Sequence, residues 1–75
     1  PFNPSTQFVV TLSEPGPITL RVFSVLGQLV RTQTINGEPG LNQIHFLADG
    51  LSSGNYLYQI TTHMGQSTGM MTLSK

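Results

Sequence analysis

The fold class is indicated most clearly by residues 55–63, which read Asn55-Tyr56-Leu57-Tyr58-Gln59-Ile60-Thr61-Thr62-His63. Large side chains that favour a core recur there at every second position, at Tyr56, Tyr58 and Ile60. Successive side chains of a β-strand point to opposite faces of its sheet, so these three share one face. Tyrosine, isoleucine and threonine are also common in strands. The segment therefore predicts a strand that buries one face.

The same alternation recurs on both sides of this segment. The strands predicted in this way cover residues 6–13, 18–23, 29–35, 41–47, 55–63 and 67–74. The connections between them are predicted at residues 14–17, 26–28, 36–40, 48–54 and 64–66. Asn36-Gly37 is the strongest turn signal, because both residues tolerate a positive φ. Alternation fails where Leu29 and Val30 are adjacent, which predicts a β-bulge.

Six strands, or seven if one is split, at a spacing of about 8 to 12 residues are typical of a β-sandwich or barrel. Two small sheets packed face to face are the simplest way for every strand to bury one apolar face. We therefore predict an all-β sandwich of mostly antiparallel strands. Its predicted core consists of Phe8, Val10, Leu12, Ile18, Leu20, Val22, Val30, Ile44, Phe46, Tyr56, Tyr58, Ile60, Met71 and Leu73.

Length and charge exclude several classes of protein. The chain has 75 residues and no cysteine, so we expect one domain over residues 1–75, without disulfides. Residues 1–5 are predicted to be a linker entering that domain from a larger precursor. Nucleic-acid binding needs several cations on one face, whereas the basic residues Arg21, Arg31 and Lys75 are scattered. No apolar run approaches the roughly 20 residues that span a bilayer, so no membrane insertion is expected.

Candidate catalytic and metal-binding residues are few. His45, Asp49, Ser52 and Ser53 include the side-chain types of a nucleophilic triad. The two serines, however, lie in a glycine-flanked turn, where serine is common for conformational reasons. His45 and His63 are predicted on the solvent faces of strands, and two histidines without a third ligand rarely bind a metal. We therefore predict no enzyme activity, no metal and no cofactor.

Carbohydrate binding is a more serious alternative, because small β-sandwiches often present aromatic side chains to sugars. Phe23 and Leu57 are the candidates for exposure, whereas Tyr56 and Tyr58 are predicted to face the core. The chain has no tryptophan, the usual platform for a sugar ring. Composition and periodicity alone therefore support only a soluble all-β domain.

Four motifs follow one another along the chain. They are Pro-Phe-Asn-Pro-Ser-Thr at residues 1–6, an alternating strand with a glycine turn at 18–30, Gly-Leu-Ser-Ser-Gly-Asn-Tyr-Leu-Tyr at 50–58, and a closing strand at 68–75. In this order they resemble the type A C-terminal sorting domains of the type IX (Por) secretion system of Bacteroidetes, over essentially the whole chain. Ser24, Gln28 and Met70 stand where that family often has Asp, Arg and Lys.

The resemblance implies an immunoglobulin-like sandwich, monomeric and continuous with an N-terminal carrier protein. It implies that the outer-membrane translocon recognises the domain in the periplasm, and that a sortase-like cysteine protease removes it at or before Pro1. The carrier would then be at the cell surface or outside the cell. The family-motif residues that the resemblance assigns to recognition or to the fold are Asn3, Pro4, Gly27, Val30, Gly50, Leu51, Gly54, Tyr56, Tyr58, Gly65 and Lys75.

Two other functions stay open at this point. One is a polysaccharide-binding module of a secreted enzyme, and the other is a structural spacer like the related module of flagellar hook-capping proteins. The sorting function is favoured because the chain stops just after its last predicted strand. The low charge also predicts weakly protected edge strands, such as residues 68–75, to which a receptor sheet could add a strand.

Overall fold

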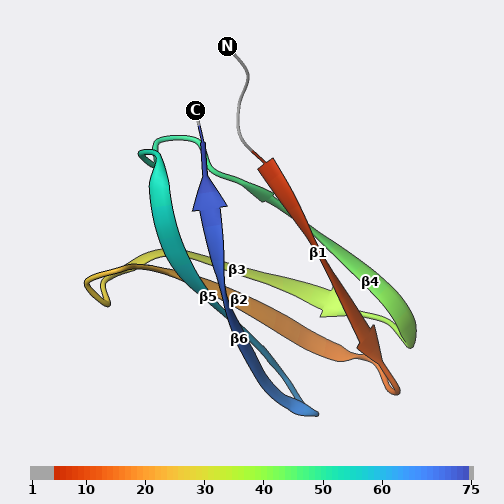
Figure 1. Ribbon diagram of the computed structural model, residues 1–75. Helices are drawn as coiled ribbons and strands as arrows, with labels where there is room; N and C mark the ends of the chain where they lie inside the picture. Colours follow the sequence, from red (N-terminus) through yellow and green to blue (C-terminus); the bar gives the residue numbers. More distant parts are fainter. Residues whose placement is uncertain (1–4, 75) are drawn as a thin grey trace.

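The computed structural model describes residues 5–74, and every regular element in that range is a β-strand (Figure 1). In chain order the strands are β1 (Ser5–Leu12), β2 (Gly16–Ser24), β3 (Leu29–Gly37), β4 (Gly40–Leu47), β5 (Gly54–Thr62) and β6 (Gly65–Leu73). No helix in this part of the chain is long and apolar enough to cross a membrane. β2 and β6 begin earlier than predicted, each at a glycine.

The strands form two sheets. β1 pairs with β4 in a two-stranded sheet, and the other sheet has the order β3-β2-β5-β6. Every pairing is antiparallel. Figure 1 shows the β1–β4 pair as a separate layer beside the larger sheet, with β3 and β4 joined across the two layers. The predicted all-β sandwich of antiparallel strands is confirmed, with six strands in the described part.

The core lies between the two sheets and takes alternate residues from each strand. Ile18, Leu20 and Val22 of the central strand β2 are at most 1% exposed, and Ile44 and Phe46 of β4 at most 2%. Each such side chain contributes roughly 1.5–3 kcal/mol on burial. Every residue of the predicted core is either buried or packed against the buried cluster. Ala48 and Leu51 are also buried, which alternation did not predict because they lie in a loop.

The predicted bulge lies at Val30. Val22 of β2 faces Arg31 of β3, but the next residue, Phe23, faces Leu29, so Val30 is the extra residue on β3. Val30 packs against the core, whereas Leu29 is 53% exposed. Arg31 shares the inner face with Val22, so plain alternation would turn Val30 outward and Leu29 inward. The extra residue reverses this, so that Val30 reaches the core and Leu29 faces solvent.

The prediction of a turn at Asn36-Gly37 is wrong. Gly37 is the last residue of β3, pairs with Gly16 of β2, and does not have a positive φ. A Cβ at Gly37 would lie 2.8 Å from Ile18 Cδ1 and 2.9 Å from the carbonyl oxygen of Gly16. Glycine is required there because neighbouring groups approach closely, and not because the chain reverses.

The chain reverses at Glu38 and Pro39 instead. Proline fixes its own φ and has no N–H to pair in a sheet, and Gly40 follows with a φ of +97°. The side chain of Asn42 accepts a hydrogen bond from the Glu38 N–H at 2.9 Å and donates one to the Glu38 carbonyl at 2.8 Å. This side chain closes the turn in place of backbone pairing.

The prediction of His63 on a strand is also wrong. β5 ends at Thr62, and His63 and Met64 form the exposed turn before β6. The Met64 N–H donates to Thr62 Oγ1 at 3.0 Å. In a longer strand, this N–H would instead bond to the backbone of a neighbouring strand.

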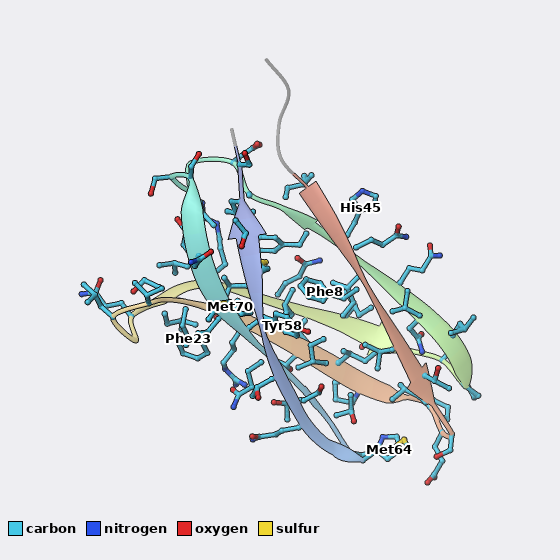
Figure 2. All side chains as sticks on the ribbon, in the orientation of Figure 1. Phe8, Phe23, His45, Tyr58, Met64 and Met70 are labelled. Atoms are coloured by element: carbon cyan, nitrogen blue, oxygen red, sulfur yellow. The ribbon has the colours of Figure 1, made fainter. Side chains whose placement is uncertain are left out.

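Tyr58 connects the two sheets. Its ring centroid lies 4.8 Å from that of Phe8 on β1, with the rings tilted by 59° (Figure 2). Gly69 of the edge strand β6 lies opposite Tyr58, and a Cβ there would be 2.5 Å from Tyr58 Cζ. The tyrosine ring thus fills the space that a side chain at position 69 would need, which compensates for the weak packing of an edge glycine.

Candidate recognition surface

The family-motif residues divide between the two ends of the sandwich. Asn3, Pro4 and Lys75 lie outside the described residues. Most of the others lie at the end where β2 finishes and β5 starts, or in the loop before it: Gly27, Val30, Gly50, Leu51, Gly54 and Tyr56. Tyr58 is in the middle of β5, and Gly65 begins β6 at the opposite end (Figure 1). The motif therefore marks one end of the fold and one distant turn, rather than a single cavity.

The β4–β5 loop, residues 48–53, is held by its own hydrogen bonds. The Leu51 N–H donates to the Ala48 carbonyl at 3.1 Å, and both side chains are buried. The Tyr56 hydroxyl donates to the Ser52 carbonyl at 2.7 Å. The Gly-Leu-x-Ser-Gly-x-Tyr block thus forms a compact loop. Its leucine side chain is buried in the core, and its tyrosine hydroxyl binds the loop backbone.

Replacing Tyr56 by Phe should lower the free energy of unfolding by about 1 kcal/mol, because the Ser52 carbonyl loses its donor while the ring stays in place. Urea unfolding followed by circular dichroism would measure the change. The matched control is Tyr58→Phe, since the Tyr58 hydroxyl makes no such bond within residues 5–74, and its stability should change by less than about 0.5 kcal/mol. Equal losses in the two variants would contradict this account of the loop.

The β2–β3 turn, residues 25–28, lies at the same end. Gly27 has a φ of +89°, and its N–H donates to the Ser24 carbonyl at 2.9 Å, while the Ser24 N–H donates to the Gln28 carbonyl at 2.8 Å. A β-carbon at Gly27 would be strained by that φ. The predicted tight connection at residues 26–28 is therefore confirmed.

Arg31 ties β3 to the β4–β5 loop. Its guanidinium donates through Nη1 to the Val30 carbonyl at 2.8 Å and through Nη2 to the Asp49 carbonyl. A Cβ at Gly50, which has a φ of +82°, would lie 3.3 Å from the same Nη2. The arginine therefore has a structural role at this end of the sandwich.

The residue types considered for catalysis or metal binding are arranged differently. His45 is exposed on β4, and the Ser52 hydroxyl lies 3.4 Å from the Tyr56 hydroxyl. Asp49 is an exposed loop residue that bonds Arg31 through its backbone. Within residues 5–74, no group of three histidine or acidic side chains is placed to hold a metal ion.

The outer face of the four-stranded sheet, which points away from β1 and β4, carries a feature that sequence reasoning missed. Four apolar side chains line up across it, one from each strand: Leu29, Phe23, Leu57 and Met70. We call these four residues the apolar row. Phe23 and Leu57 were already candidates for exposure, but the row becomes visible only when the strand order and register are known.

Comparison with known protein families identifies the chain's family. The sequence profile of a family described as the secretion system C-terminal sorting domain, a domain of Por (type IX) secretion, matches residues 2–73. No curated protein and no solved structure is significantly similar to the chain. The match includes all six strands and the motif-bearing loop and turn described above. The chain therefore belongs to the family of type IX secretion system C-terminal sorting domains.

Proposed function

We propose that this domain directs a covalently attached carrier protein through the outer membrane by the type IX secretion system and is then cleaved off. The observation that carries the proposal is the family match over residues 2–73. The family is defined by sorting and not by catalysis, so the domain acts as an address. A translocon component binds the folded domain in the periplasm, and a sortase-like cysteine protease cuts at or before Pro1. The carrier is left at the cell surface or in the medium.

A folded address needs a rigid surface, and the described chain supports one. The two features with the family motif at one end of the sandwich, the β2–β3 turn and the β4–β5 loop, are fixed by backbone hydrogen bonds and by Arg31. Rigid presentation reduces the entropy lost on binding. The domain acts without a cofactor and as a monomer in this proposal.

A secretion assay tests the proposal. Residues 1–75 with their natural upstream linker are fused behind a signal peptide and a fluorescent protein, and expressed in a host with a type IX system. We expect fluorescence at the cell surface or in the medium, and its loss in a strain without the translocon. Retention of an intact, folded fusion in the periplasm of the competent host would reject the sorting function.

The edge strand β6 offers a specific mode of recognition. It lies at the edge of the larger sheet, and residues 65–73 contain no charged side chain that would discourage pairing. A receptor strand that pairs with β6 would gain backbone hydrogen bonds without requiring a particular sequence.

Deleting residues 69–75 should abolish export if β6 pairs with a receptor. Circular dichroism must show whether the deleted domain still folds. Because deletion removes most of an edge strand, Thr68→Lys is the second variant: it keeps the strand and protects its edge with a charge. Normal export of a folded Thr68→Lys domain would contradict strand addition at β6.

A polysaccharide-binding function is less favoured by the arrangement of aromatic side chains. Sugar-binding sandwiches present rows of aromatic rings, but the apolar row contains one ring, that of Phe23. Tyr56 and Tyr58 face the inside of the sandwich.

A further inference from the structure

The apolar row crosses all four strands on the outer face of the larger sheet. Leu29 of β3 faces Phe23 of β2, Phe23 faces Leu57 of β5, and Leu57 faces Met70 of β6. Leu29, Leu57 and Met70 are 53%, 40% and 63% exposed. Around Phe23, Leu57 and Met70 the surface forms an open hollow of about 500 Å³. Contiguous exposed apolar side chains on a small protein mark sites of interaction more often than single ones do.

The next row on the same face is polar and contains one charge. It runs from Thr32 through Arg21 and Gln59 to Thr68. Along β2, Arg21 and Phe23 are two residues apart, so the guanidinium and the hollow lie beside each other on one face. Figure 2 labels Phe23 and Met70, the row members that line the hollow from β2 and β6.

Unlike that of Arg31, the guanidinium of Arg21 has no hydrogen-bond or ion-pair partner within residues 5–74. The residue is half-buried, and its backbone lies in the pairings of β2 with β3 and β5. The acidic residues lie elsewhere: Glu14, Glu38 and Asp49 are all in exposed turns or loops. A half-buried guanidinium without a partner retains its donors for a carboxylate, which it can bind through two parallel hydrogen bonds.

These two features define the chemistry of a partner. We propose that the outer face of β2, β5 and β6 binds an extended segment of a partner protein, which places an apolar side chain in the hollow and a carboxylate on Arg21. The spacing supports an extended segment, because residues i and i+2 on one face of a strand are about 7 Å apart, as are adjacent rows of this sheet. The inference rests on the proposed function in one respect only, namely that the partner belongs to the export machinery. The binding itself is a property of this chain.

A peptide library tests the inference without any export assay. The 75-residue chain is applied to an immobilised library of octapeptides on a Ser/Thr background, in which positions 4 and 6 are varied over all amino acids. We expect selection of Leu, Met or Phe at one position and Asp or Glu at the other. The strongest peptide, added to the isotope-labelled domain, should shift the NMR signals of Phe23, Leu57 and Met70 more than those of β1 and β4.

Charge variants give the sharper result. Arg21→Gln, which keeps most of the side-chain stem, should weaken binding of the selected peptide about tenfold or more, since it loses a charge-assisted pair. Arg21→Glu should select lysine or arginine in place of the carboxylate. Met70→Thr should also weaken binding of the selected peptide, because it removes apolar surface that lines the hollow. The matched control is Leu41→Thr, which changes a leucine that is 74% exposed on the β1–β4 sheet and should leave binding unchanged.

Several outcomes would overturn the inference. They are selection without a carboxylate, unchanged binding by folded Arg21→Gln, NMR shifts confined to β1 and β4, and self-association of the domain through the apolar row in sedimentation. If the domain binds these peptides but is not exported, the proposed sorting function is wrong and the binding site is retained. If the domain is exported but binds none of the peptides, the binding site is wrong and the sorting function is retained.

Discussion

Replacing Gly37 by Ala is expected to destabilise the domain by about 3 kcal/mol, the upper end of the usual cost of overpacking a core. The added Cβ would lie 2.8 Å from Ile18 Cδ1 and 2.9 Å from the backbone oxygen of Gly16. The side chain of Leu12 would also be too close to the new Cβ. The side chains of Leu12 and Ile18 and the Gly16 backbone must therefore all move. A domain of this size has a total stability on the order of 5 kcal/mol. Urea unfolding should therefore show the midpoint falling by more than half.

The matched control is Gly16→Ala, on the partner residue in the same cross-strand pair. There the nearest atom to a new Cβ is the side-chain Nδ1 of His63, at 3.2 Å, and that exposed imidazole can move away. We expect a change of less than about 1 kcal/mol. If the two substitutions cost the same, close packing at Gly37 is not what requires glycine, and its place in the β2–β3 pairing would have to be explained differently.

Replacing Phe46 by Ala is expected to cost about 3–5 kcal/mol, which is most or all of the stability of a domain of this size. Phe46 is 2% exposed and supplies one of the largest side chains on the inner face of β4. The two-stranded sheet has few other residues with which to cover the larger sheet, so the cavity cannot close easily. Circular dichroism and the dispersion of the NMR spectrum would report the loss.

Leu47→Ala is the control for this substitution. The side chain follows Phe46 directly but is 57% exposed, so its truncation should change stability by about 0.5 kcal/mol or less. In the secretion assay, the Phe46 variant should be lost or retained while the Leu47 variant is exported normally. Export of an unfolded Phe46→Ala domain would show that the translocon reads sequence segments and not the folded surface.

The strands and the core follow from the two-residue period of the sequence. Alternation identified the buried faces of β2, β4 and β5, and its failure at Leu29-Val30 identified the bulge. The Asn36-Gly37 prediction was wrong because a glycine needed for close packing has the same sequence signature as a glycine needed for a turn. The close contacts of position 37 with Leu12, Ile18 and the Gly16 oxygen separate the two. Leu51 was missed because a loop residue that enters the core breaks no periodic pattern.

Less of the candidate surfaces could be predicted. The motif residues of the β4–β5 loop were identified by family resemblance, but their hydrogen bonds depend on how the loop folds over Tyr56. The apolar row combines residues 23, 29, 57 and 70. The alternating pattern places each of them on the solvent face of its own strand but does not show that the four are neighbours. Their alignment depends on the strand order β3-β2-β5-β6, which periodicity does not determine.

The pairing of β1 with β4 has a kinetic consequence. Ser5 of the first strand aligns with Leu47 of the fourth, so the smaller sheet cannot close until most of the chain has been made. The β2–β3 and β5–β6 hairpins need only local contacts and can form early. All-β domains with such distant pairings fold in milliseconds to seconds, far more slowly than domains with local contacts. A newly made chain would thus spend a measurable time with its hairpins formed and its inner apolar faces exposed, and a chaperone could bind those faces during that interval.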